Sequence, residues 1–169
     1  MAFTFRFFVF LAAILFSFTT IAAPKNDAAE TVIHLYKDFA WEAVFIVPWK
    51  INESLSNASP EVLGQYFDDQ LVSLLIKDRN CGLVFCNLDF SPMWESMDPL
   101  GASIVIRTTD RPDVVTVEVR YFNGNSMLTY FLRETSAGWK IRDIDTYKGS
   151  LLSILSKPYE KSDPVLPPP

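Results

Sequence analysis

Histidine, cysteine and glycine are scarce in this sequence. Its 169 residues include one histidine, two cysteines and six glycines, with no glycine-rich phosphate loop. A single histidine excludes most zinc sites and, unless His34 supplies the base, the usual histidine-based triads. Lysine and arginine are also few: 15 of them against 20 acidic residues give a net charge of −5, which argues against nucleic acid bound through its phosphates. We therefore expect no metal, no cofactor and no nucleic-acid partner.

The N-terminus holds a long apolar run that no other part of the chain matches. Arg6 is followed by the apolar segment Phe7–Phe18 and then by small and hydroxylated residues, the layout of a secretory signal peptide. The run is shorter than the roughly 20 residues that span a bilayer, which favours a cleaved signal over a retained anchor. Thr20 and Ala22 fit the recognition positions for cleavage after Ala22.

These features divide the chain into three parts. We expect a signal peptide at residues 1–22, a single domain at 23–156 and a disordered tail at 157–169, which holds five of the eleven prolines. Apolar residues make up 49% of the chain and charged residues 21%, so one domain of this length can bury a core. The expected location is periplasmic or secreted, with no membrane span after signal cleavage.

The two cysteines are separated by four residues. In an exported protein, Cys81 and Cys86 are most simply explained as a structural disulfide. A redox pair and free thiols remain alternatives, although the spacing is not C-x-x-C and no basic residue between the cysteines lowers a thiol pKa. The disulfide would hold the short apolar loop between them in place.

Hydrophobic periodicity predicts two helices followed by a sheet. Helical spacing covers 29–47, and Ser59 with Pro60 begins a second helix that runs to about residue 77. A long irregular loop occupies 79–101, and a short helix at 149–156 closes the domain. The strands between them alternate with period two and turn at an Asn-Gly pair; they cover 102–109, 113–123, 126–134 and 138–145.

This order of elements predicts an α+β domain. N-terminal helices would pack on a curved antiparallel sheet of about four strands, arranged like a cone, with a short C-terminal helix. One apolar sheet face needs a helix to cover it, and a sheet that wraps a helix leaves one open end. An open end of that kind is a candidate pocket.

The C-terminal part of the domain resembles a family of uncharacterised bacterial exported proteins. The resemblance is carried by Trp139–Ile144 (WKIRDI), by Gly149–Leu152 with the following leucine, and by Leu35-Tyr36 and Asp98-Pro99. The family is a domain of unknown function among the nuclear-transport-factor-like, cystatin-like cone folds. Arg142 stands where the family more often has an acid. The resemblance implies a cone fold and an envelope location, and it implies no reaction.

Asp143 is the most informative single residue of the predicted sheet. Strict alternation places it on the same face as Trp139 and Ile141. A carboxylate on an inner face must be paired, hydrogen-bonded or neutral. Two interpretations stay open: an acid in a pocket that it shares with Tyr36, Trp139 and Tyr121, or a structural aspartate bonded to backbone amides or to an arginine.

The loop at 79–101 is unusually apolar for a connecting segment. Phe85, Phe90 and Trp94, with the acidic Asp98, form a candidate contact loop. If its aromatic side chains are buried, they would cover the open end of the cone. If they are exposed, they would form a surface for a partner or a ligand. The acids of the loop match no EF-hand spacing, so we expect no metal there.

No residues are visibly arranged for catalysis. We therefore expect an exported, non-enzymatic binding or interaction module, whose partner is an envelope protein that it assists or an enzyme that it inhibits. A small-ligand carrier is one alternative. A cone-fold lyase or isomerase that uses Asp143 is the other.

Overall fold

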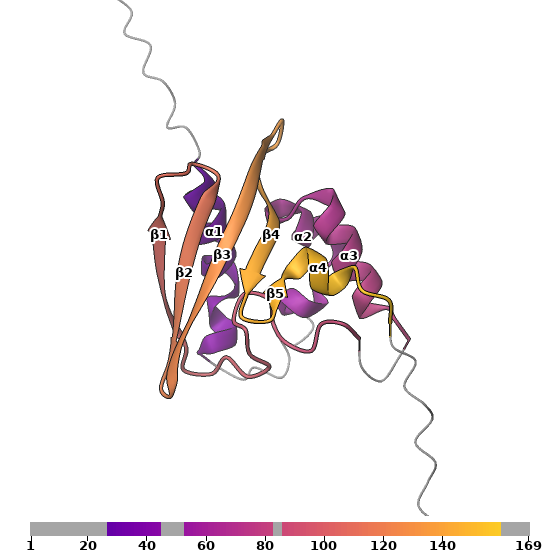
Figure 1. Cartoon of the computed structure of the whole chain (residues 1–169), viewed down its shortest axis with the longest axis horizontal. Helices are drawn as coiled ribbons and strands as arrows, with labels where there is room; N and C mark the ends of the chain where they lie inside the picture. The colour runs from indigo at the N-terminus through magenta and orange to yellow at the C-terminus, as the bar shows by residue number, and fades with distance from the viewer. Residues whose placement is uncertain (1–26, 45–52, 83–85, 160–169) are drawn as a thin grey trace, which may run out of the picture.

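The computed structural model of this protein describes residues 27–44, 53–82 and 86–159. The predicted signal peptide at 1–22, Phe85 and residues 160–169 of the predicted tail lie outside the described residues. The described chain begins with helices, continues into a sheet and ends with a short helix (Figure 1). Its elements are α1 (Ala28–Phe39), η1 (Ala40–Ala43), η3 (Leu55–Asn57), α2 (Pro60–Tyr66), α3 (Asp69–Arg79), β1 (Ser103–Thr108), β2 (Val114–Tyr121), β3 (Gly124–Thr135), β4 (Gly138–Thr146), β5 (Gly149–Ser150) and α4 (Leu151–Leu155).

The α-helices begin where short polar side chains can cap them. Such a side chain accepts a hydrogen bond from a backbone amide of the first turn, which otherwise has no partner inside the helix. The caps of α1, α2, α3 and α4 are Asp27, Ser59, Asp68 and Ser150. The predicted helix start at Ser59-Pro60 is confirmed. The first helix, predicted to reach residue 47, is α-helical only to Phe39 and then tightens into η1.

The prediction of one continuous second helix from Pro60 to about Lys77 is wrong. The helix is interrupted between α2, which ends at Tyr66, and α3, which begins at Asp69. Phe67 is extended and forms a parallel bridge with Ile141 of β4, and the Asp68 amide donates to the Ile141 carbonyl at 2.9 Å. Asp68 then caps α3. The interruption lets Phe67 pair with β4 at Ile141, a part of the strand that β5 does not cover. Helical periodicity does not reveal such a long-range contact.

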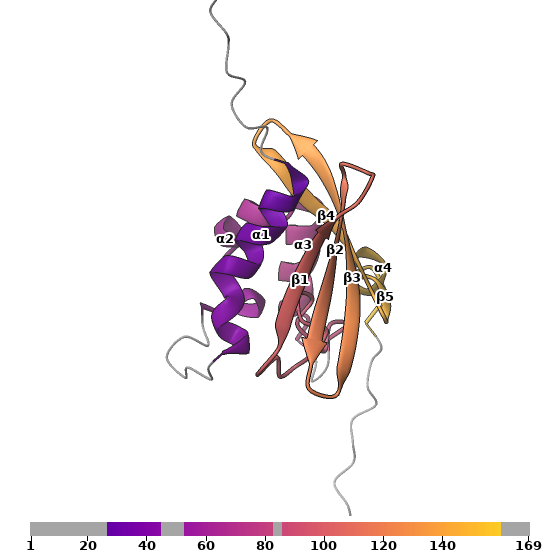
Figure 2. The same cartoon turned by 90° about the vertical axis from the view of Figure 1, so that its left-hand side faces the viewer.

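The sheet is an antiparallel meander in the order β1-β2-β3-β4-β5. The predicted strands are confirmed to within one or two residues, and the two-residue β5 adds a fifth. The turn between β2 and β3 comprises Phe122 and Asn123, with Tyr121 opposite Gly124, so β3 begins two residues earlier than predicted. Helices α1, α2 and α3 lie against the same face of the sheet (Figure 2). The predicted α+β fold with a curved sheet is therefore confirmed.

The core lies between α1 and the inner sheet face. Alternate residues of β2 and β3 are almost fully buried there, as period two predicts. Each such side chain contributes roughly 1.5–3 kcal/mol relative to an exposed one. The core side chains of α1, β2 and β3 are Val32, Leu35, Tyr36, Phe39, Val115, Val117, Val119, Leu128, Tyr130 and Leu132.

A β-bulge interrupts the alternation of β4. Leu132 of β3 lies opposite Ile141, whereas Phe131 lies opposite Asp143, so Arg142 is the extra residue. Ile141 and Ile144 are consequently both fully buried, and Asp143 is only half-buried. The expectation that Asp143 shares a face with Ile141 is therefore wrong.

Candidate ligand-binding groove

An open groove of about 650 Å³ lies between the α2–α3 region and the loop that follows the disulfide. Its volume is in the range of small-molecule sites. Most of its surface is apolar, as ligand pockets usually are. The apolar side chains that line it include Leu55, Leu63, Leu75, Leu88, Phe90 and Met97.

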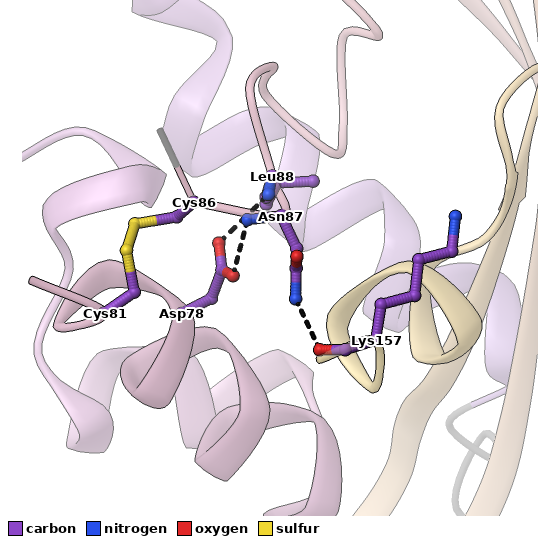
Figure 3. Close-up of a disulfide and its surroundings, with 6 residues drawn as sticks. All are labelled: Asp78, Cys81, Cys86, Asn87, Leu88 and Lys157. Carbon is purple, nitrogen blue, oxygen red and sulfur yellow. Dashed lines mark hydrogen bonds between the residues drawn. A yellow bond between two sulfur atoms is a disulfide. The ribbon is translucent and has the colours of Figure 1, made fainter. Parts of the chain in front are cut away.

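The first fixed point of the groove wall is the disulfide region (Figure 3). Cys81 and Cys86 form the predicted disulfide directly after α3. The buried carboxylate of Asp78 accepts the backbone amides of Asn87 at 3.0 Å and Leu88 at 3.1 Å. The side-chain amide of Asn87 donates to the Lys157 carbonyl at 2.9 Å. Two hydrogen bonds thus hold the chain at 86–88 to α3, the disulfide holds it to the segment after α3, and one hydrogen bond holds it to the segment after α4.

The second fixed point is Glu42 of η1. One oxygen of its carboxylate accepts the Leu55 amide at 2.8 Å, and the other accepts the indole N–H of Trp94 at 2.9 Å. Burial raises the pKa of Glu42, and these two hydrogen bonds oppose the rise. Glu42 therefore joins η3 to the 91–96 turn, and residues of both segments line the groove.

Hydrogen bonds from the buried Tyr36 and the half-buried Tyr121 hold the 91–96 turn in place. Tyr36 of α1 donates to the Met93 carbonyl at 2.6 Å, and Tyr121 of β2 donates to the Trp94 carbonyl. The Tyr36 and Tyr130 hydroxyl oxygens are 2.9 Å apart. Burial raises the pKa of Tyr36 and of Tyr130 well above the ordinary range, so both are neutral hydrogen-bonding groups at neutral pH.

The structure brings together two of the four residues predicted to form a pocket. Tyr36 and Tyr121 bond to adjacent carbonyls of the same turn. Trp139 lies elsewhere, on a smaller pocket of about 230 Å³ beside the start of α1. Asp143 lies at the start of α4, where its carboxylate accepts the Ser150 hydroxyl at 2.6 Å and the Leu152 amide at 3.0 Å. The bond to the Leu152 amide agrees with the interpretation of Asp143 as a structural aspartate that accepts hydrogen bonds from backbone amides.

The predicted contact loop is divided between buried and exposed side chains. Phe90 and Trp94 are buried, and Phe90 lines the groove. Asp98 is exposed, as is Met97, of which 85% is accessible. Phe85 lies outside the described residues. The aromatic part of the loop therefore covers the interior, and Met97 lies at the mouth of the groove.

Sequence analysis missed the polar residues that organise the groove. Glu42, Asp78 and Arg79 are charged residues of helical segments, and no local pattern distinguishes them from charges that face solvent. The sequence indicates burial for Tyr130 alone, because it lies two residues from Leu128 and from Leu132 and so shares their face of the strand. The others depend on which loop folds back onto which helix.

The described part of the chain contains neither a metal-binding cluster nor a membrane-spanning helix. No group of three or more histidine, cysteine or acidic side chains among residues 27–44, 53–82 and 86–159 could hold a metal ion. Within the same ranges no helix is both long and apolar enough to cross a membrane.

Comparison with known proteins gives little guidance. No protein-family model matches the chain, and no curated protein matches it. Among solved structures, a phospholipid-binding protein from Ralstonia solanacearum in complex with a phospholipid is similar, with 14% sequence identity and a TM-score of 0.48. The alignment covers 76% of this chain and 83% of that one. A likeness at this level establishes no shared ligand, and the family resemblance seen in the sequence stays a prediction.

Proposed function

We propose that this protein is an exported, non-enzymatic binding module that holds a small, largely apolar ligand in the groove. The observation that carries the proposal is the groove itself: an apolar space of about 650 Å³ whose walls are fixed by polar anchors. Hydrogen bonds from Asp78 and Glu42 hold these walls, so less conformational entropy would be lost on binding.

The position of Asp143 favours binding over the alternative of lyase or isomerase chemistry. Such chemistry would need Asp143 and a second polar group to converge on one substrate. Its carboxylate instead bonds to Ser150 and Leu152 at the start of α4, and Asp143 does not line the groove. Tyr36 and Tyr121 already donate their hydroxyl protons to backbone carbonyls.

The disulfide supports the exported location. Structural disulfides persist in oxidising compartments and are rare in the cytosol. We propose that residues 1–22 direct export to the periplasm or the medium and are then removed. The ligand would be taken up there, either for transfer or as part of an interaction with an envelope protein.

Nile red, a neutral apolar dye whose fluorescence rises in apolar sites, tests the proposal. The variant Leu75→Trp fills the groove from α3, and Ser73→Trp places the same side chain on the same helix at an exposed position outside the groove. We expect saturable fluorescence enhancement with the wild type and Ser73→Trp, and at least a tenfold weaker apparent affinity with Leu75→Trp, since the bulk occupies the ligand's space.

Either of two results would overturn the proposal. One is equal dye binding by all three proteins after each has been shown to be folded by circular dichroism. The other is no saturable binding by the wild type, together with no small molecule retained in native mass spectrometry of the mature protein.

A further inference from the structure

The charged residues that line the groove differ in how well they are paired. The Asp78 carboxylate is satisfied by two backbone amides. The Asp89 carboxylate forms an ion pair with Lys148 at 2.7 Å. Arg79 is the remaining charge, and within the described residues it forms no ion pair; one terminal nitrogen donates to the Ala58 carbonyl at 2.9 Å. Arg79 is therefore the one charge lining the described groove that lacks an oppositely charged or multiply bonded partner.

The guanidinium of Arg79 has spare binding capacity. It carries five N–H donors in a planar fork, and the Ala58 carbonyl uses only the donor on one terminal nitrogen. Arg79 is an exposed residue, and partial desolvation of its guanidinium lowers its pKa without an offsetting carboxylate. An anion at this place would accept two of the remaining N–H donors as a bidentate pair.

A second polar group of the groove also lacks a partner. Ser91 lines the groove, and its hydroxyl oxygen is buried without a hydrogen bond in the described structure. Buried hydroxyls are nearly always hydrogen-bonded, because desolvation without a partner is unfavourable. A ligand with hydrogen-bonding atoms would supply what Ser91 lacks.

We propose that the ligand of this groove is an anionic amphiphile. Its apolar chain lies along Leu63, Leu75 and Phe90, and its carboxylate or phosphate head is bound by Arg79. This inference rests on the proposed function, because it names the class of ligand that the same groove holds. The net charge of −5 opposes an anion at long range, but a Debye length of about 8 Å at physiological salt leaves the direct contact with Arg79 dominant.

Two ten-carbon ligands that differ in the head alone provide the test. Calorimetric titrations with decanoate and 1-decanol, both below any aggregation threshold, compare the wild type with Arg79→Gln. The matched control is Arg142→Gln, which removes a guanidinium that stacks over Phe131 and lies away from the groove. A further variant, Arg79→Lys, keeps the positive charge and loses the bidentate fork.

We expect the wild type and Arg142→Gln to bind decanoate about tenfold more tightly than 1-decanol, the usual size of a charge-assisted hydrogen-bonding contribution. The preference should disappear in Arg79→Gln while the affinity for 1-decanol stays within about twofold. Arg79→Lys should keep part of the preference. Decyl phosphate should behave like decanoate, and inorganic phosphate alone should bind at least tenfold more weakly than decyl phosphate, since it lacks the chain.

The inference is overturned if the wild type does not distinguish decanoate from 1-decanol, or if Arg79→Gln keeps the preference. It is also overturned if inorganic phosphate binds as tightly as decyl phosphate, which would indicate a plain anion site. If 1-decanol still binds the wild type in those cases, the groove binds apolar chains and the proposed function stands. If no ten-carbon ligand binds, the proposed function itself fails.

Discussion

Tyr36 of α1 and Tyr130 of β3 share a hydrogen bond between their buried hydroxyls, 2.9 Å apart. The Tyr36 proton goes to the Met93 carbonyl, so Tyr130 is the donor to Tyr36. A helix, a strand and the turn beside the groove are thereby linked through two side chains. Tyr36 therefore makes two hydrogen bonds in this network, and Tyr130 makes one.

That inequality predicts different costs for two similar substitutions. Tyr36→Phe leaves both the Met93 carbonyl and the Tyr130 hydroxyl without partners, and we expect it to lower the free energy of unfolding by about 2–3 kcal/mol. Tyr130→Phe leaves the bond to Met93 intact and should lower it by only about 1 kcal/mol. Urea denaturation of the two variants measures the difference. Equal costs would contradict the direction assigned to these bonds.

Asp143 is expected to stabilise α4 without affecting the ligand. Asp143→Ala removes the acceptor of the Ser150 hydroxyl and of the Leu152 amide, so we expect a loss of about 1–3 kcal/mol in unfolding free energy. The apparent affinity for Nile red should remain within twofold of the wild type, because Asp143 does not line the groove. Lost dye binding in a protein that is still folded would return Asp143 to the role of pocket acid.

The disulfide and Asp78 should contribute differently to the groove. Reduction of Cys81–Cys86 opens a short loop and should lower the free energy of unfolding by about 2 kcal/mol. Dye binding should persist, because Asp78 still holds the amides of Asn87 and Leu88. Asp78→Ala should lower stability by about 1–3 kcal/mol and weaken dye binding as well. Equal loss of binding in both proteins would contradict this prediction, because it would show that the disulfide shapes this wall as much as Asp78 does.

The burial of Glu95 should make the stability of the protein depend on pH. Its backbone has φ of 52°, and one carboxylate oxygen is buried without a hydrogen bond while the other accepts the Tyr147 amide at 2.8 Å. Burial, with repulsion from Asp145, raises the pKa of Glu95, and the Tyr147 amide lowers it by less. The folded state thus holds this proton at pH values where the unfolded chain has released it.

Stability associated with Glu95 is therefore present below the ordinary carboxyl pKa and is lost as pH rises through the raised value. Glu95→Gln keeps an acceptor for Tyr147 and removes the charge. We expect the variant to gain stability relative to the wild type on going from pH 4 to pH 8, measured as the urea midpoint at each pH. The raised pKa of Glu42 acts in the same direction in both proteins and does not affect the comparison. Parallel pH profiles would contradict the prediction.

The sequence by itself determined the order of elements and the sides of the sheet. The Ser59 cap acts on an amide three residues away, and alternation in β2 follows from backbone geometry, so neighbouring residues are sufficient to predict both. The disulfide was predictable for a related reason: its two cysteines are close in sequence.

Only the tertiary structure decided the features that shape the groove. The break at Phe67 depends on the free edge of β4, and the bulge at Arg142 depends on register with β3. Glu42 meets Trp94 across 52 positions, and the spare guanidinium of Arg79 is evident only once Ala58 and the loop are placed around it. Each depends on partners that are distant in the chain, and local periodicity carries no information about such pairings.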